Sequence, residues 1–297
     1  MRRRPGFTLI ELLMAISIIA LLVSLILPAV QSARENARKL HCANNLMQLG
    51  LGLGCYASAH SVLPPGVVND SGPIKNLPFG YHHSWVVQIL PFIGQGSIYE
   101  HVDQRASVYD PGNDTVAELK IATLMCPSDN SQASHNYAGC HHDLEAPIAA
   151  LNHGVLYLNS HVRYRDITDG TAFTILLGET SGGGPSLGWV SGTRSTLRNT
   201  GTPLNERQTF PPMPVAGKVV AVNSVPRDEL FEFVEALAED GRWPVELTGG
   251  FSSNHALFSN FLFSDGSVHP VKKAVNSEIY RFLGNRADGE LIGSDQY

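Results

Sequence analysis

The chain begins with a short basic stretch that leads into a long apolar run. Residues 12–30, LLMAISIIALLVSLILPAV, hold no charged residue and only two serines. A helix needs roughly 20 apolar residues to cross a bilayer, so the pattern predicts a membrane-spanning helix. Arg2, Arg3 and Arg4 stand in front of it.

An ordinary secretory signal peptide is the alternative interpretation of this segment. The apolar run is longer than a typical signal core, and after Pro28 the sequence AVQSARENARKL continues as a helix without a small-x-small cleavage site. Glu11 also lies at the very start of the run, between Ile10 and Leu12. A carboxylate there costs a few kcal/mol in lipid unless it is paired, so Glu11 is a functional candidate.

The helix is predicted to continue beyond the membrane, over 31–60. Apolar and small residues recur there at spacings of three and four, which predicts a face that packs on the rest of the protein. These residues are Leu40, Ala43, Leu46, Met47, Gly50 and Leu51. The sequence SVLPPG at 61–66 ends the helix, which is then on the order of 75 Å long.

Residues 61–297 are predicted to form one β-rich head. The stretch NFLFSDGSVHPV is typical of a β-hairpin in which Asp265 and Gly266 supply two positive-φ positions. Phe261 and Phe263 alternate with Leu262 and Ser264, which predicts a strand with one face more buried than the other. By the same reasoning, Asp169-Gly170 is predicted to be a turn that leads into the strand TAFTILL. RDELFEFVEALAED at 227–240 is predicted to be a helix. The expected fold class is α+β, with an antiparallel sheet packed on the long helix.

Composition agrees with a loop-rich head, since the chain has 28 Gly and 18 Pro with 43% hydrophobic and 16% charged residues. Its net charge of −6 provides no positive field for nucleic acid. Motifs for an acyl-transfer serine, a metalloprotease or a phosphate loop are absent from the sequence, so we expect neither an enzyme nor a cofactor.

The N-terminus resembles the leader of type IV prepilins and type II secretion pseudopilins through the sequence RRRPGFTLIELL at 2–13. The resemblance implies that a membrane peptidase cuts between Gly6 and Phe7 and methylates the new amino group of Phe7. It implies that Glu11 pairs with the N-terminal amine of a neighbouring subunit, and that Pro28 kinks the helix near the membrane surface.

The same resemblance implies a cleaved leader at 1–6, a transmembrane helix at 7–30, and a single-pass inner-membrane protein whose head lies on the extracytoplasmic side. Charges on the two sides of the span are nearly even, so they do not decide orientation alone. The implied partners are the prepilin peptidase and methyltransferase, other pilin-like subunits, the inner-membrane assembly machinery and the lipid bilayer.

The head resembles a large bacterial family of pilin-like proteins with a C-terminal H-x9-DG signature, here His255 followed by Asp265 and Gly266. The blocks that carry it are HCANNL at 41–46, LPPG at 63–66, Trp85, LPFIGQ at 90–95, CPSD at 126–129, NYAG at 136–139 and DITDGTAFTILLGET at 166–180. The sequence departs from the family after His255, where ALF replaces a small, Gly-rich stretch, and 199–240 is interpreted as an insertion.

Two groups of residues are candidate metal ligands. Asp166, Asp169, Glu179 and Asp265 have the oxygen ligands that Ca²⁺ prefers, although Asp before Gly is more simply explained by turn chemistry. Cys140-His141-His142-Asp143 has zinc-type residues, but its spacing matches no zinc pattern and adjacent His side chains diverge. A polar loop with a disulfide is the preferred interpretation there.

The four cysteines are Cys42, Cys55, Cys126 and Cys140. On one continuous helix Cys42 and Cys55 lie about 20 Å apart, too far for a disulfide. One bridge from helix to head is therefore favoured, and we expect Cys42 with Cys126 because both lie in blocks that match the family. Cys55 and Cys140 are then free or form a second bridge; four buried thiols are the alternative.

Two functions remain open at this point. One is a structural subunit of a pilus or a type II secretion pseudopilus. The other is a stand-alone anchored protein whose head binds a glycan or another surface ligand.

Overall fold

The computed structural model describes residues 9–129, 134–181, 186–206, 213–215, 218–220, 245–290, 292–293 and 295–297. The leader at 1–6, the predicted cleavage point between Gly6 and Phe7 and the predicted helix at 227–240 lie outside the described residues.

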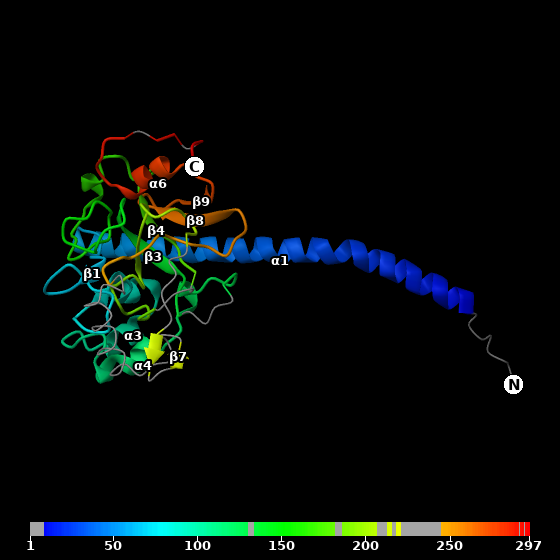
Figure 1. Cartoon of the computed structure of the whole chain (residues 1–297), viewed down its shortest axis with the longest axis horizontal. Helices are drawn as coiled ribbons and strands as arrows, with labels where there is room; N and C mark the ends of the chain where they lie inside the picture. Colours follow the sequence, from blue (N-terminus) through cyan, green and yellow to red (C-terminus); the bar gives the residue numbers. More distant parts are fainter. Residues whose placement is uncertain are drawn as a thin grey trace.

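Helix α1 (Leu9–His60) is 52 residues long and contains Pro28. At 1.5 Å per residue its length is about 78 Å, as predicted. Its C-terminal half runs through the head, and its N-terminal half extends alone away from it and curves (Figure 1). Ser61 ends the helix in a left-handed conformation with φ 64°.

The head is built on a five-stranded sheet in the order β5-β3-β4-β8-β9. Its strands are β3 (Tyr137–His142), β4 (Ile175–Glu179), β5 (Leu197–Asn199), β8 (Phe258–Phe263) and β9 (Val268–Lys272). Neighbouring strands from β3 to β9 are antiparallel, with Gly139 opposite Leu177 and Phe261 opposite His269. The predicted antiparallel sheet is thus correct for four strands, whereas β5 pairs with β3 in parallel.

Both faces of the sheet are covered, so the head has three layers. Leu262 of β8 belongs to the same core as Leu46 of α1. Phe261 and Phe263 face the other way and pack with Tyr280 of α6 (Ser277–Gly284). The expectation that one face of β8 is less buried than the other is therefore wrong, because α6 covers the second face. The sequence patterns did not predict α6. Figure 1 shows α6 on the side of the sheet away from α1.

The face of α1 that packs on the head differs from the predicted one. Leu40 and Leu51 are 68% and 71% exposed, and of the predicted set only Leu46 is fully buried. The buried positions of α1 are Cys42, Asn45, Leu46, Leu49, Gly52, Leu53 and Ala57. Spacings of three and four also describe this set, in which Asn45 and Cys42 bond to the head.

Short elements complete the structure around this framework. The helical segments are α2 (Trp85–Ile89), η1 (Leu90–Ile93), α3 (Gly96–His101), η2 (Pro111–Asn113), α4 (Asp114–Ala117), η3 (Ala122–Leu124) and η4 (Tyr164–Asp166). Two-stranded antiparallel sheets are formed by β1 (Val67–Val68) with β2 (His83–Ser84) and by β6 (Met213–Val215) with β7 (Lys218–Val220).

The predicted hairpin between β8 and β9 is present, but its turn is of another type. The Gly266 amide donates to the Phe263 carbonyl at 3.0 Å, and the Phe263 amide donates to the Ser267 carbonyl at 2.9 Å. Gly266 has φ 88°, whereas Asp265 has no positive φ. The loop therefore has three residues and a glycine bulge, and the expected pair of positive-φ residues is reduced to Gly266.

Candidate functional site at the helix–head junction

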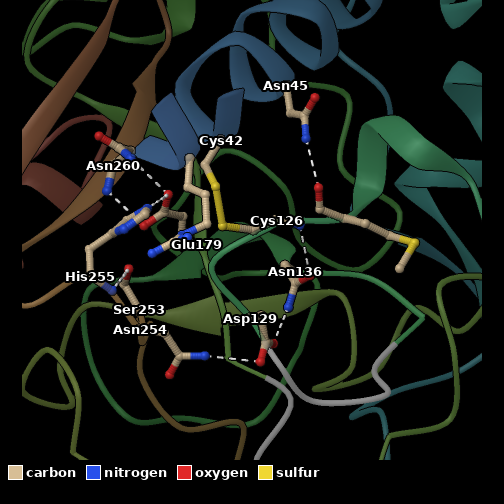
Figure 2. Close-up of a disulfide and its surroundings, with 12 residues drawn as sticks. Cys42, Asn45, Cys126, Asp129, Asn136, Glu179, Ser253, Asn254, His255 and Asn260 are labelled. Carbon is tan, nitrogen blue, oxygen red and sulfur yellow. Dashed lines mark hydrogen bonds and ion pairs between the residues drawn. A yellow bond between two sulfur atoms is a disulfide. The ribbon is translucent and has the colours of Figure 1, made fainter. Parts of the chain in front are cut away.

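A disulfide joins α1 to the head where α1 passes the loop after η3. Cys42 and Cys126 are bonded, with their Cα atoms 5.1 Å apart and a separation of 84 in sequence (Figure 2). Both side chains are buried. The bridge confirms the pairing that the family resemblance suggested.

Hydrogen bonds tie the same turn of α1 to the head. The Asn45 amide group donates to the Met125 carbonyl at 2.8 Å, and the Tyr137 hydroxyl donates to the Cys42 carbonyl at 3.2 Å. Both side chains are buried. A buried polar group left unpaired is costly, so these bonds fix one position of α1 along the head.

A second set of bonds holds the loop that carries Cys126. The Cys126 amide donates to the Asn136 side-chain oxygen at 2.9 Å, and the Asn136 nitrogen donates to Asp129. Asn254 also donates to Asp129, at 2.9 Å. The loop at 126–129 is thereby linked both to the start of β3 and to the residue before His255.

His255 lies between two carboxylates from different parts of the fold. Its Nδ1 is 3.0 Å from Oε1 of Glu35 on α1, and its Nε2 is 3.4 Å from Oε1 of Glu179 at the end of β4. The His255 side chain is fully buried, Glu179 is 3% exposed, and Glu35 is 32% exposed. Figure 2 shows His255 and Glu179 beside the disulfide.

Each carboxylate has additional donors. Glu179 accepts from the Asn260 amide at 3.0 Å and from its side chain at 2.8 Å. Arg38, one turn along α1, pairs with Glu35 at 2.5 Å. These donors stabilise the ionised carboxylates.

His255, Glu35 and Glu179 shift one another's pKa values. Burial opposes protonation of His255, but Glu179 and Glu35 outweigh it and raise the pKa of His255 above 6.5. Burial would raise the pKa of Glu179 and of Glu35, yet His255, helped by Arg38 at Glu35 and by Asn260 at Glu179, lowers both below 4.5. The three groups are therefore held in their charged forms by one another. We call Glu35, Cys42, Cys126, Glu179 and His255 together the helix–head clamp.

The clamp unites segments that are far apart in sequence. Apart from Glu35 of α1, its residues come from the blocks HCANNL and CPSD, from the end of the block at 166–180 and from the signature histidine. The block NYAG supports it through the bond from Cys126 to Asn136. The arrangement fixes α1 to the head through a covalent bond, an ion bridge and hydrogen bonds.

The clamp also has the residue types of a metal site, because the ligand atoms of Cys42, Cys126, Glu179 and His255 lie within 4.8 Å of one another. The two sulfurs are bonded to each other and so offer no thiolates.

Three of the predicted calcium ligands bind backbone amides: Asp166 and Asp265 bind those within their own turns, and Asp169 binds those of the C-terminal loop. Asp166 accepts from the Arg163 amide, Asp265 from the Ser267 amide and hydroxyl, and Asp169 from the amides of residues 288 and 289. Neither metal-type cluster among the described residues includes Asp166, Asp169 or Asp265, whereas Glu179, the fourth predicted calcium ligand, lies in the clamp.

The remaining predicted residues lie away from the clamp. Cys55 is an exposed free thiol and Cys140 a buried one, so the disulfide expected near His141 does not form. Glu11 lies in the first turn of α1, and its pairing with a neighbouring subunit stays a prediction.

Sequence reasoning did not find the role of Glu35 or the true partner of Glu179. In the sequence, Glu35 is one charge among several after the apolar run, and Glu179 has the residue type of a calcium ligand. The H-x9-DG signature marked His255 without naming what it binds. The signal for Glu179 was its position in a buried strand, where a carboxylate requires a partner.

Comparisons with known proteins agree with both resemblances. The family model described as "Protein of unknown function (DUF1559)" matches residues 31–278. The model of the prokaryotic N-terminal methylation motif matches residues 1–27. Among curated proteins and among solved structures, nothing matches the chain.

Proposed function

Because the chain belongs to the DUF1559 family and starts with a prokaryotic N-terminal methylation motif, we propose that it is a type IV pilin-like structural subunit. A prepilin peptidase cuts it between Gly6 and Phe7, and α1 assembles it with other pilin-like subunits into a pilus or a type II secretion pseudopilus. The role is structural and involves no catalytic step.

The observation that carries the proposal is the bare apolar half of α1. Its most apolar 18-residue window has a mean hydropathy of 2.8, and none of that window is buried by the rest of the chain. Large side chains from Leu9 to Val30 are 40–79% exposed. Burying this surface is worth about 25 cal/mol per Å², so lipid or neighbouring helices must cover it.

The disulfide supports placement of the head outside the cytoplasm. Disulfides persist in oxidising compartments and are rare in the cytosol, and Cys42–Cys126 lies in the head. With the N-terminus cytoplasmic, the head of a single-pass inner-membrane protein lies on the extracytoplasmic side.

Assembly is tested at Glu11. We expect Glu11→Gln to keep membrane insertion, because it removes a costly intramembrane charge, and to lower the amount of this chain in filaments sheared from cells. Ser24→Ala is the matched control, since the Ser24 hydroxyl donates to the Leu21 carbonyl of the same helix. An unchanged yield for Glu11→Gln would favour the alternative, an anchored protein whose head binds a surface ligand.

A further inference from the structure

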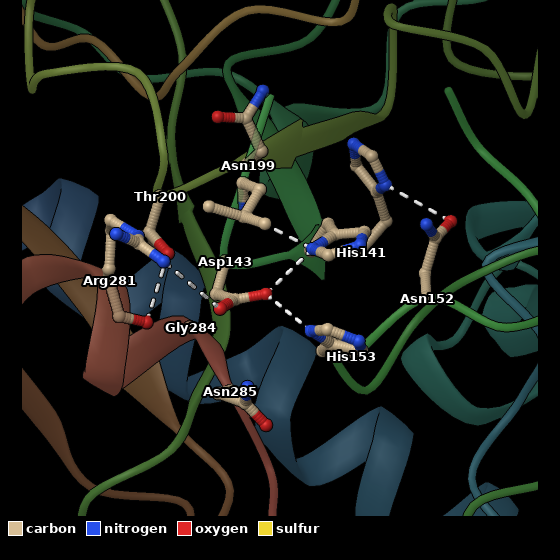
Figure 3. A network of polar contacts seen from close by, with 12 residues as sticks. His141, Asp143, Asn152, His153, Asn199, Thr200, Arg281, Gly284 and Asn285 are labelled. Atoms are coloured by element: carbon tan, nitrogen blue, oxygen red, sulfur yellow. Dashed lines mark hydrogen bonds and ion pairs between the residues drawn. The ribbon is translucent and has the colours of Figure 1, made fainter. Parts of the chain in front are cut away.

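A second cluster of metal-type side chains lies at the other end of β3 from the clamp. His142 ends β3 and Asp143 follows it. His153 lies beside Asp143, on the loop that returns along the strand (Figure 3). Nδ1 of His142 is 2.7 Å and Nδ1 of His153 is 2.8 Å from the same atom, Oδ1 of Asp143. The three ligand atoms all lie within 4.8 Å of one another.

We propose that His142, Asp143 and His153 bind a divalent transition-metal ion of the Zn²⁺ class. Two imidazoles and one carboxylate form a donor set that binds ions of this class in preference to Ca²⁺ or Mg²⁺. The site is separate from the clamp and does not depend on the proposed assembly role.

The hydrogen bonding of His142 favours a cation at this point. The Leu144 amide donates to Nδ1 of His142 at 3.1 Å, which requires a lone pair on that nitrogen. The same nitrogen faces Asp143 Oδ1 at 2.7 Å, and an atom that accepts from Leu144 has no proton to donate to Asp143. A bound ion satisfies both the nitrogen and the carboxylate, and takes the place of the Leu144 amide on the nitrogen lone pair.

The spacing of the ligands suits an ion of this size. Donors about 2.0 Å from a tetrahedral ion lie roughly 3.3 Å apart. The two nitrogen–oxygen distances of 2.7 and 2.8 Å therefore need to open by about half an ångström. The His153 side chain is 49% exposed, so it has room to move and leaves an open position for water.

The backbone around the ligands is fixed in advance. Nη1 of Arg286 donates to the carbonyls of Asn152 and Gly154, each at 2.7 Å, and the Arg286 amide donates to the His153 carbonyl at 3.1 Å. These bonds hold both sides of His153.

The other ligands are held as well. The Thr200 amide donates to the His142 carbonyl at 3.1 Å. Arg281 lies 3.9 Å from Oδ2 of Asp143 and so orients the oxygen that faces away from the histidines. Supporting contacts of this kind raise metal affinity.

His141 does not belong to the site. Its Nε2 contacts the Thr248 hydroxyl at 2.9 Å and its Nδ1 contacts Asn152 at 3.3 Å, so the adjacent histidines diverge, as predicted. The third ligand is instead His153, which the sequence spacing did not indicate.

The test is calorimetric titration of the full-length, detergent-solubilised protein with Zn²⁺, using a chain without a polyhistidine tag. We expect one equivalent to bind, and Co²⁺ in its place to give the absorption bands of a four- or five-coordinate ion. His153→Gln should weaken Zn²⁺ binding at least tenfold and keep the thermal unfolding temperature, because the side chain is half exposed. Asp143→Asn should weaken binding as well.

His161→Gln is the matched control, since His161 is an exposed loop histidine outside the cluster. Its Zn²⁺ affinity should equal that of the wild type. The proposal is overturned if the wild type binds no stoichiometric Zn²⁺, or if His153→Gln binds as tightly as His161→Gln.

Discussion

At the scale of single residues, His255 connects the membrane helix to the sheet through charge. Glu35 belongs to α1 and Glu179 to β4, and both lie within 3.4 Å of the same imidazole. Lys39, one turn further along α1 from Glu35, is 5.0 Å from the Phe258 ring, which lies 5.7 Å from the His255 ring. The bridge is therefore the charged centre of a larger helix–head contact.

This bridge predicts how the stability of the head depends on pH. The folded pKa of His255 is raised above 6.5, so its contribution is complete below pH 6.5 and is lost as pH rises through the raised value. The pKa values of Glu35 and Glu179 are lowered below 4.5, so their contribution is complete above pH 4.5 and is lost as pH falls through the lowered values. Urea unfolding of the full-length protein in detergent should show greatest stability between these limits.

The variant His255→Gln isolates the contribution of the histidine to the free energy of unfolding. Breaking a buried ion pair typically costs 3–5 kcal/mol, and we expect about 3 kcal/mol because Asn260 still binds Glu179. The loss of stability as pH rises through the pKa of His255 should be absent in this variant. His101→Gln, at an exposed position on α3, should keep the wild-type profile. An alkaline decline that persists in His255→Gln would contradict the assignment.

Gly266 is required for its backbone conformation and not for space. Its φ is 88°, and a Cβ placed there meets no atom within 4 Å. Left-handed conformation costs most residues about 1–2 kcal/mol, whereas Asn adopts it readily. We expect Gly266→Val to destabilise the head by at least that amount and Gly266→Asn to be much milder, measured by thermal unfolding. Equal effects of the two variants would show that another property of the turn matters.

The sequence identified these residues unequally. The family blocks indicated Cys42–Cys126 and His255 because they recur as local patterns. The partner of His255 on α1 is 220 positions away, and no local pattern encodes a contact over that separation. Asp265 was expected in the left-handed region because Asp-Gly favours a two-residue turn; the structure uses a three-residue loop, in which the glycine alone takes that conformation.

At the scale of elements, α1 combines a lipid-type half with a half that packs closely on the head. Two glycines allow the close approach. A Cβ on Gly52 would lie 2.5 Å from the Ile93 side chain, and one on Gly50 would lie 2.8 Å from Leu262. Residues that weaken an isolated helix thus permit tight packing of this one.

Replacing Gly52 and Gly54 separately by Ala tests this close packing. Gly52→Ala adds a methyl group to a filled space, which costs about 1–3 kcal/mol and exceeds the gain of up to about 1 kcal/mol in helix propensity. The nearest atom to a Cβ on Gly54 is 4.0 Å away, so Gly54→Ala should be neutral or stabilising. Urea unfolding measures both, and stabilisation by Gly52→Ala equal to that by Gly54→Ala would refute the close packing.

The cysteines make a second prediction at this scale. Non-reducing peptide mapping should recover Cys42 linked to Cys126. Iodoacetamide should label exposed Cys55 in the native protein and Cys140 only after unfolding, because burial raises the pKa of the Cys140 thiol well above its usual range. Replacing both bridged cysteines by Ser should cost about 4 kcal/mol for a loop of this length. A Cys42–Cys55 peptide would mean that α1 is broken.

Element prediction succeeded where the pattern was long or the turn was local. The helix of 52 residues and the hairpin of β8 and β9 were both indicated by their own sequence. β4 begins at Ile175, later than predicted, because 171–174 are still part of the turn. The parallel partner β5 has three residues, too few for a periodic signal. Helix α6 has eight residues, and its capping residue Asn276 was the available sign.

At the scale of the whole molecule, the anchor and the core of the head are the same helix. The head cannot rotate freely about α1, because the ion bridge at Glu35, the disulfide at Cys42 and the packed glycine at Gly50 lie about two turns apart along it. Displacement of α1 by its neighbours in an assembly would therefore move the head as one body. The bare half of α1 is what such neighbours would contact.

The most direct test of this account is the mass of the N-terminal peptide of the protein extracted from membranes. We expect the mature chain to begin at Phe7 and to carry one added methyl group on its amine, as the N-terminal methylation motif implies. A chain that still begins at Met1, or one whose new end lies near Ala33 after removal of the whole apolar run, would contradict the pilin-like assignment.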